Sequence, residues 1–314
     1  MRVLLVRLDG IGDAAVCTPL IAALRSAGHE VGVALTTRNA GLFAPEAILA
    51  EHVLDRIPWP AHGSTPESAA RARAEIAAQR YDVALIASEE PEAYALAARI
   101  PRRVGFATGW TRPLKTLWVR LRTTRVVDRA QRVGREDAHE AEVLYRLGAG
   151  FVAEAAPPVD LPRLRDVLLG AAEGVPGRGV LLQAGPKWGA VGVSETTLRA
   201  LVPALTPAGL RVVAAPGEEE QVRATLGVAP ETFPDLRGWV EALAGAAVVV
   251  TVDTGAAHVA GMLGVPVVDV FPNAHFATQV RRWRPWAAPY RAIPVASLAN
   301  GTGAAIIEAV RDGF

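Results

Sequence analysis

The chain alternates short apolar runs with amphipathic segments, and this alternation constrains its fold more than any other feature. Residues 2–8 (RVLLVRL) predict a buried strand, and residues 14–28 (AAVCTPLIAALRSAG) carry apolar residues at helical spacing, with Gly28 as the stop. The alternation continues with a predicted strand at residues 30–37, a helix at residues 66–80, a strand at residues 81–88 and a last helix at residues 136–149. Such alternation predicts a parallel sheet covered by helices.

An Ala- and Pro-rich stretch without periodicity, residues 150–162 (GFVAEAAPPVDLP), interrupts the pattern as a linker would. Beyond it, strands are predicted at residues 179–185, 209–217, 246–253 and 265–271. A length of 314 residues also exceeds what one core usually supports. We therefore expect two α/β domains, residues 1–155 and 156–314, each doubly wound, with ligands bound in a central cleft at the carboxyl ends of the strands.

Composition narrows the class of protein. A hydrophobic fraction of 51% with 21% charged residues is that of a soluble globular chain, and no apolar run reaches the roughly 18 residues of a membrane span. The N-terminus lacks a signal-peptide pattern, and a single cysteine, Cys17, excludes an intramolecular disulfide and fits a reducing cytoplasm. A net charge of +1 gives no reason to expect a nucleic-acid partner.

The loop after the first predicted strand, VRLDGIGDAA at residues 6–15, has two interpretations. Gly10, Gly12 and Ala15 match the G-x-G-x-x-A fingerprint of a dinucleotide site, which would make the chain an NAD(P)-dependent oxidoreductase. However, the second strand ends in ALTTR, without the acid that holds the adenine ribose, and Arg38 suits a 2′-phosphate only weakly. A carboxylate at residue 13 would also repel a pyrophosphate.

In the second interpretation, Asp13 is the purpose of this loop. A carboxylate in the first helical turn is stabilised as the anion, so it can take a proton from a hydroxyl group as a general base. Gly10 and Gly12 would then let the backbone turn sharply and admit a bulky acceptor. The capping alternative is that Asp13 or Asp9 only caps the helix and has no catalytic role.

A second strand end, in residues 248–271 (VVVTVDTGAAHVAGMLGVPVVDVF), also opens a helix. Backbone amides near Gly255, the hydroxyl of Thr254 and the imidazole of His258 are placed to face one anion, which predicts a diphosphate site. The alternative is that Asp253 is an N-cap and His258 an ordinary residue of the first turn.

Together, VRLDGIGDAAVCTPLIAALR and VDTGAAHVAGMLGVPVVDVF resemble the paired motifs of glycosyltransferase family 9, the ADP-heptose:lipopolysaccharide heptosyltransferases. The resemblance implies a GT-B fold of two Rossmann-like domains, with the acceptor held by the first and the nucleotide sugar by the second. It also implies an inverting transfer without a metal or other cofactor. Carried over by motif, Asp13 is the base, Gly10 and Gly12 form the acceptor loop, and the donor is held by Asp253, Thr254, Gly255 and His258.

The resemblance adds two donor-site residues. Of the 33 basic residues only Lys115 and Lys187 are lysines, and Lys187 follows the first strand of the second domain, where the family has a lysine that contacts donor phosphates. An ammonium suits a phosphate as a point charge. The family also suggests an acid for the nucleoside after the next strand, and Glu218 is the nearest choice, with Glu219 and Glu220 on the solvated helix face.

Four further segments bear on this assignment. KWGAVG at residues 187–192 and FPNAHF at residues 271–276 depart from the family pattern where donor choice could be made. Residues 111–135 hold eight basic residues against one acid, interleaved with large apolar residues, a composition that suits an anionic glycolipid or leaflet as well as a solvated helix over core packing. The last predicted helix, residues 303–313, is expected to fold back over the first domain by the GT-B resemblance.

The sequence thus predicts a cytoplasmic, inverting, metal-independent transferase, with peripheral contact to the inner face of the membrane as a further expectation. It moves a heptose-like sugar from a nucleotide-diphosphate donor, by resemblance ADP-linked, to a hydroxyl group of a cell-envelope glycan or lipopolysaccharide-type acceptor. Two alternatives stay open at this point: an NAD(P)-dependent oxidoreductase that uses Gly10 and Gly12, and a non-catalytic sugar-nucleotide-binding module. The presence of Asp13 favours a catalytic protein over a non-catalytic binding module.

Overall fold

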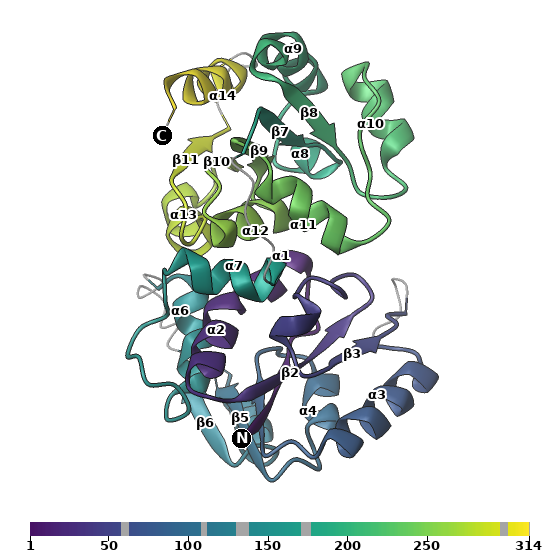
Figure 1. Cartoon of the computed structure of the whole chain (residues 1–314), viewed down its shortest axis with the longest axis vertical. Coiled ribbons are helices and arrows are strands. Elements are labelled where there is room, and N and C mark those ends of the chain that lie inside the picture. The colour runs from purple at the N-terminus through teal and green to yellow at the C-terminus, as the bar shows by residue number, and fades with distance from the viewer. Residues whose placement is uncertain (58–62, 108–111, 130–137, 171–176, 296–300, 314) are drawn as a thin grey trace. The chain divides into compact units, whose positions relative to one another are not determined.

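The computed structural model describes residues 1–57, 63–107, 112–129, 138–170, 177–295 and 301–313 (Figure 1). The chain divides into two compact units: unit 1 comprises Met1–Val159 and Asp166–Gly170, and unit 2 comprises Asp160–Arg165 and Ala171–Phe314. Helix α7 (Leu161–Leu169) contributes residues to both. The assignment of acceptor and donor to residues 1–155 and 156–314 stays a prediction, as does a cleft between two facing domains.

Unit 1 is built on a parallel sheet whose strand order is β3-β2-β1-β4-β5-β6. Its strands are β1 (Arg2–Val6), β2 (Glu30–Thr36), β3 (Glu51–Leu54), β4 (Val83–Ile86), β5 (Arg102–Ala107) and β6 (Arg125–Asp128). The order reverses between β1 and β4, and ligands of such sheets bind at the carboxyl ends of the strands at this switch point. The loops after β1 and β4 therefore lie where a ligand of this sheet is expected to bind.

The helices of unit 1 are α1 (Ile11–Ala15), α2 (Thr18–Ser26), α3 (Pro66–Gln79), α4 (Pro91–Leu96), α5 (Pro113–Arg120) and α6 (Glu140–Tyr145). The single helix predicted over residues 14–28 is wrong. It is two helices, because Pro19 has no N–H to donate and stands in the first turn of α2, where a proline is tolerated. Gly28 then ends the segment at a φ of +77°, a conformation that favours glycine.

Unit 2 repeats the design with a parallel sheet of order β11-β10-β9-β7-β8. Its strands are β7 (Val180–Gln183), β8 (Leu210–Val213), β9 (Val248–Val252), β10 (Val267–Phe271) and β11 (Tyr290–Pro294). Its helices are α8 (Lys187–Ala190), α9 (Glu195–Leu205), α10 (Glu219–Leu226), α11 (Leu236–Ala244), α12 (Gly255–Leu263), α13 (Phe276–Trp283) and α14 (Gly301–Asp312). Here the switch point lies between β7 and β9.

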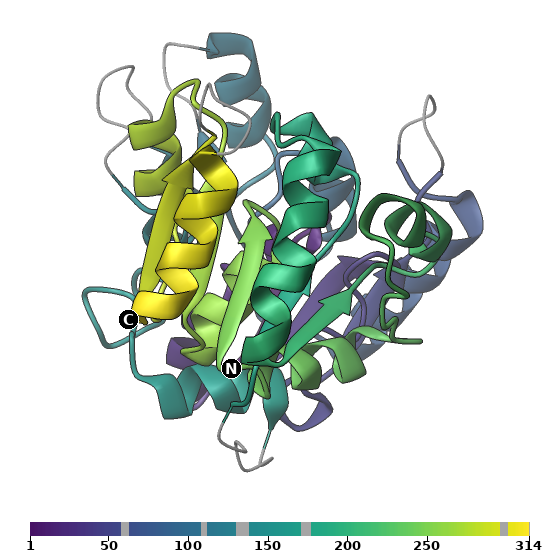
Figure 2. The same cartoon turned by 90° about the horizontal axis from the view of Figure 1, so that it is seen from above.

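One part of the core of unit 2 lies between one face of this sheet and helices α9 and α14. Alternate residues of β9 and β10, such as Val250 and Val268, pack there with Leu201 of α9 and Ile306 of α14. Figure 2 shows α14, in yellow, beside α9, in accord with the contacts of α14 to α9, β10 and β11. The packing of this last helix on the first domain stays a prediction.

The prediction of parallel sheets covered by helices is confirmed in both units. Among the helices of the described residues, none combines the length and the hydropathy that crossing a membrane requires.

Candidate functional site

The carboxylate of Asp13 is held at both of its oxygens. Its Oδ2 accepts a hydrogen bond from the backbone N–H of Gly10 at 3.2 Å, and its Oδ1 lies 2.6 Å from Nη2 of Arg7. The Asp13 side chain is 34% exposed, whereas that of Arg7 is 5% exposed. Asp13 therefore caps α1, as the capping alternative predicts. It also presents a fixed carboxylate at the surface of the loop after β1.

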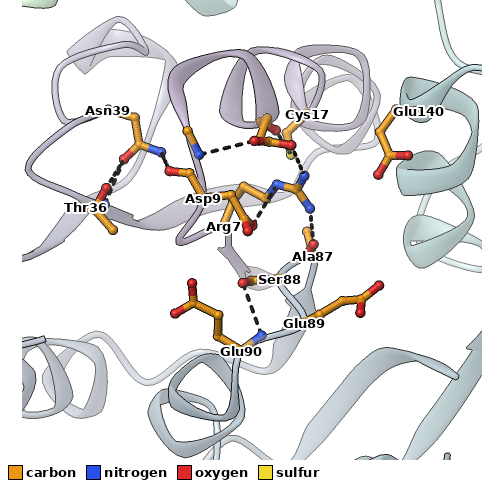
Figure 3. A network of polar contacts seen from close by, with 12 residues as sticks. Arg7, Asp9, Cys17, Thr36, Asn39, Ala87, Ser88, Glu89, Glu90 and Glu140 are labelled. Carbon is orange, nitrogen blue, oxygen red and sulfur yellow. Dashed lines mark hydrogen bonds and ion pairs between the residues drawn. The ribbon is translucent and has the colours of Figure 1, made fainter. Parts of the chain in front are cut away.

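Arg7 is the residue that the sequence analysis missed in this loop (Figure 3). Its Nη1 donates to the carbonyl of Ala87, which follows β4, and its Nε lies 3.2 Å from Oδ2 of Asp9. Burial lowers the pKa of Arg7, but the charges of neighbouring groups, Asp9 and Asp13 among them, raise it above its ordinary value. Arg7 therefore joins the loops after β1 and β4 at the switch point while it orients Asp13. A basic residue at the end of an otherwise apolar strand was the only clue to it.

Asp9 plays a different part from Asp13. Burial raises the pKa of Asp9, and the nearby Arg7 offsets this only in part. The Asp9 backbone carbonyl accepts from Nδ2 of Asn39 at 3.1 Å, and the Asn39 side-chain oxygen accepts from the N–H and hydroxyl of Thr36 at the end of β2. The loop is thereby tied to β2 as well as to β4.

The glycines of this loop do not provide the sharp turn that was expected. Gly10 has a φ of −78° and a ψ of 176°, an extended conformation open to any residue, and Gly12 is not among the residues with positive φ. The Gly10 N–H is also taken by Asp13, so it is not free to bind a pyrophosphate. This arrangement weakens the dinucleotide interpretation.

A second charged cluster of unit 1 surrounds Glu89, which follows β4. Glu89 pairs with Lys115 and, at 2.6 Å, with Arg129, and Arg129 in turn pairs with the fully buried Glu140 at 2.7 Å. Burial raises the pKa of Glu89, but Lys115 and Arg129 outweigh burial and hold it below its ordinary value. Lys115, one of the two lysines of the chain, is thus engaged in an ion pair with a residue that lies far from it in the sequence.

In unit 2, Lys187 connects the two loops of the switch point. It begins α8 after the three-residue loop that follows β7, and its Nζ donates to the backbone carbonyl of Asp253, which directly follows β9. Because β7 and β9 are neighbours in the sheet, this contact gathers both strand ends at one place. The ammonium of Lys187 is exposed there.

Thr254, not Asp253, is the N-cap of α12. Its Oγ1 accepts from the N–H of Ala256 at 3.3 Å and lies 2.9 Å from Oγ1 of Thr251, which donates to the carbonyl of Val252. The alternative that Asp253 caps this helix is therefore wrong. The hydroxyl of Thr254 is already engaged, while Gly255 occupies the first position of the helix.

His258 lies in the same helix and is buried. Its Nε2 lies 3.4 Å from Oδ1 of Asp253, and its ring packs edge to face on Trp283 at 5.6 Å between centroids. Its Nδ1 is buried and has no hydrogen-bond partner within the part of the chain that the structure describes. A buried nitrogen without a partner is costly, so this atom is a candidate contact for a ligand.

Glu218 approaches the Lys187 loop from β8. It is half-buried and immediately precedes α10, and a Cβ added at Gly185 would lie 2.8 Å from its Oε2. The carboxylate therefore rests against the backbone two residues before Lys187. Glu219 is half-buried and Glu220 is exposed on the helix that follows.

Asp269, in the middle of β10, is a functional candidate that the sequence analysis did not single out. It is fully buried, and neither of its carboxyl oxygens has a hydrogen-bond partner among the described residues. Burial raises its pKa well above the ordinary value, Asp253 adds to the rise, and Lys187 opposes it. A buried carboxyl group with a raised pKa thus lies near Lys187 and Asp253. Its only clue was an acid inside the apolar run VPVVDVF.

The two segments that depart from the family pattern have local explanations. In KWGAVG, Trp188 is buried and its indole N–H donates to the carbonyl of Gln183 at 2.8 Å, which anchors α8. In FPNAHF, His275 takes a φ of +59° as the N-cap of α13, and Phe276 packs edge to face on Phe271. Both segments are thus anchored by contacts of their own within unit 2.

A pocket of about 680 Å³ lies elsewhere in unit 1, between α3 and α4. It is lined by Arg73, Arg80 and Arg99, and also by Asp82 and Pro101, which precede β4 and β5. It therefore opens at the amino edge of the sheet, opposite the loop of Asp13. None of the predicted site residues lines it.

Comparison with known proteins relates this chain to one family. Residues 209–301 match the model of glycosyltransferase family 9 (heptosyltransferase). A search of curated proteins finds no significant match.

Solved structures share the fold over nearly the whole chain. The family 9 glycosyltransferase of Veillonella parvula is 15% identical, with a TM-score of 0.72 and coverage of 99% of this chain and 96% of the other. The E. coli heptosyltransferase WaaC with ADP is 21% identical, with a TM-score of 0.74 and 99% coverage of both chains. The E. coli ADP-heptose lipopolysaccharide heptosyltransferase II is 15% identical, with a TM-score of 0.69 and coverage of 99% and 98%.

These matches confirm the predicted GT-B type of fold. The matched segment contains five of the six predicted donor residues, Glu218, Asp253, Thr254, Gly255 and His258, while Lys187 and the Asp13 loop lie outside it. The resemblance to glycosyltransferase family 9 is thus confirmed by the family model at residues 209–301, a segment that contains the second of the two motifs.

Proposed function

We propose that this chain is a glycosyltransferase that moves a heptose-like sugar from an ADP-linked donor to a hydroxyl group of a lipopolysaccharide-type acceptor. The observation that carries the proposal is the gathering of Lys187, Asp253 and His258 at the switch point of unit 2, within or beside the matched family domain. The E. coli relative WaaC has been solved with ADP and with ADP-2-deoxy-2-fluoro heptose. That relative supports an ADP sugar as the donor.

Donor binding in this proposal relies on groups that are poised for an anion. The exposed ammonium of Lys187 exchanges the Asp253 carbonyl for a phosphate oxygen, and the partnerless Nδ1 of His258 gains a hydrogen-bond partner. The start of α12 at Gly255 adds the favourable end of a helix dipole. Glu218, beside Gly185, is placed to accept hydrogen bonds from the nucleoside.

Transfer requires a base for the acceptor. Asp13 takes the proton of the acceptor hydroxyl while the oxygen of that hydroxyl bonds to the anomeric carbon of the donor sugar. The bond from the anomeric carbon to the phosphate oxygen breaks at the same time, and its electron pair leaves with ADP. A single displacement of this kind inverts the anomeric configuration. Arg7 holds Asp13 at 2.6 Å and so acts as a positioning residue.

The departing diphosphate gains negative charge that something must stabilise. Lys187 and the N-terminus of α12 supply positive charge without a metal ion, so we propose a metal-independent reaction. The acceptor is proposed to be a membrane-borne glycolipid, with the enzyme in peripheral contact with the cytoplasmic face of the inner membrane.

The oxidoreductase alternative is not favoured, because Asp13 occupies the Gly10 N–H that a dinucleotide would need. A non-catalytic sugar-nucleotide-binding module would not need the fixed carboxylate of Asp13. Both differ from the proposal in whether a sugar is moved.

The test is incubation of the purified protein with ADP-heptose and lipopolysaccharide from a heptose-deficient strain. The proposal predicts a product heavier by one heptosyl unit, with inverted anomeric configuration by NMR, and weaker or no transfer from UDP- and GDP-sugars. Saturable ADP binding without any sugar transfer, to this or related acceptors, would favour the binding module instead.

A further inference from the structure

Helix α5 carries an unusual concentration of exposed apolar side chains. Only five large apolar residues are exposed among those that the structure describes, and three of them are Leu114 (82%), Leu117 (56%) and Leu121 (74%). Their spacing of three and four residues places them on one face of the helix and its C-cap. An exposed apolar face of this kind marks an interaction surface.

The helix is fixed with this face outward. Thr116 and Val119 are buried on its other side, Trp118 packs edge to face on Tyr94 at 4.9 Å, and Lys115 pairs with Glu89. These contacts tie α5 to α4 and to the loop after β4, and the helix also packs on β5 and β6 of unit 1. The leucines are therefore a built feature of the surface rather than a frayed end.

Basic residues flank the leucines along the sequence. Residues 112–125 contain five basic residues and no acidic one. Lys115 and Arg125 are engaged within unit 1. Arg112 and Arg120 are exposed, and no ion pair holds either within the described segments, while Arg122 stacks on Trp118 at 4.1 Å.

We propose that this face, Leu114, Leu117 and Leu121 with Arg112 and Arg120, docks on an anionic lipid bilayer. Leucines on an amphipathic helix enter the boundary between headgroups and acyl chains, and arginines beside them pair with lipid phosphates. An acidic protein would satisfy the arginines, but a bilayer satisfies the arginines and three protruding leucines together. The surface deepens the proposed function, on which its purpose rests, by naming how a lipid-borne acceptor is reached.

The first test is sedimentation of the full chain with vesicles of phosphatidylcholine, with and without phosphatidylglycerol, in the absence of nucleotide and acceptor. We expect binding that depends on phosphatidylglycerol and falls about fivefold in Arg112→Ala, the effect of one cation near an anionic surface. Leu117→Ser should lower the partition coefficient about tenfold, as expected for a leucine that is partly buried in the boundary. The control Val159→Ser removes an apolar residue of comparable exposure (62%) elsewhere and should bind like the native chain.

A second measurement separates insertion from simple electrostatic adhesion. The one native cysteine, Cys17, is buried, so a thiol-reactive environment-sensitive fluorophore can be placed selectively on Leu117→Cys or on Val159→Cys. Anionic vesicles should raise and blue-shift the emission at position 117 and leave that at position 159 unchanged.

Absence of vesicle binding, or binding with equal emission changes at both positions, would overturn the proposal and assign this face to a protein partner. The vesicles contain no glycan acceptor, so the outcome does not depend on transfer. Failure of the transferase assay with intact vesicle binding would instead count against the proposed function alone.

Discussion

Replacement of Asp13 by asparagine separates proton transfer from every other role of this side chain. The change keeps the shape of Asp13 and leaves one oxygen as an acceptor, but it removes the charge and the basicity. In the structure the two carboxylate oxygens serve two donors, Nη2 of Arg7 at 2.6 Å and the N–H of Gly10 at 3.2 Å. The amide can serve only one of them with its oxygen.

The two consequences differ in size. A general base typically contributes about 10² to 10⁴ in rate, which is about 2.7 to 5.4 kcal/mol of barrier. A lost hydrogen bond to a charged group costs about 1.5 to 3 kcal/mol of stability, and less here because the Asp13 side chain is 34% exposed and Arg7 keeps Asp9 and Ala87. A domain with about 5 to 15 kcal/mol of stability stays folded after that loss. We therefore expect kcat to fall at least a hundredfold in a protein that still folds and binds ADP.

Asp9→Asn is the matched control, because Asp9 also lies beside Arg7, with its Oδ2 3.2 Å from Nε. This variant removes the same charge from the same loop without touching the assigned base. Steady-state transfer kinetics, ADP titration and thermal unfolding should be measured on both variants. Equal losses of kcat in the two would refute the reasoning, since Asp13 would then only balance the charge of Arg7.

Three further predictions concern the metal, the thiol and the buried acid. Transfer should be unchanged by EDTA, and a loss of activity that Mg²⁺ or Mn²⁺ restores would contradict the assignment of diphosphate charge to Lys187. Burial raises the pKa of the Cys17 thiol to about 12, so it should react with a disulfide reagent at pH 8 only after unfolding; rapid labelling of the folded protein would contradict this. Burial raises the pKa of Asp269, so the folded state binds more protons than the unfolded state and stability is lost as pH rises above about 4, the unfolded value. Asp269→Asn should therefore gain stability relative to the native chain between pH 5 and pH 8 in urea titrations, and a pH-independent difference would show that Asp269 is not a buried neutral acid.

Features that depend on short stretches of sequence could be predicted. The loops that bear Asp13 and Thr254 stand where an apolar strand gives way to glycine and a helix, a local pattern that needs no knowledge of neighbours. Lys187 could be singled out because it is one of two lysines among many arginines. In each case the strand end that bears the residue lies at a switch point of its sheet.

Features that depend on which strands are neighbours could not be predicted. Arg7 reaches the carbonyl of Ala87 only because β1 and β4 are adjacent, and nothing in residues 2–8 states that. The pairing of Lys115 with Glu89 likewise joins separate loops of unit 1. Asp269 is hidden for the opposite reason, since an apolar run around a single acid predicts the strand and not the environment of its carboxyl group.

Two of the predicted segments extend beyond the described part of the chain. The basic stretch does so at residues 111 and 130–135, and the predicted helix before the linker does so at residues 136–137. Within that part, α6 begins later than predicted because His139 caps it: the N–H of Ala141 donates to His139 Nδ1 at 3.1 Å.

In the proposed reaction, unit 2 binds a nucleoside diphosphate through Lys187. The most direct test of this binding is calorimetric titration of the native chain, of Lys187→Ala and of the control Lys115→Ala with ADP, UDP, GDP and NADP⁺. We expect preferential binding of ADP, weakened about tenfold or more by Lys187→Ala, as for the loss of a charge-assisted hydrogen bond, and unchanged by Lys115→Ala. Tight binding of NADP⁺ that is indifferent to Lys187 would contradict it and return the ligand to the loop of Gly10 and Gly12.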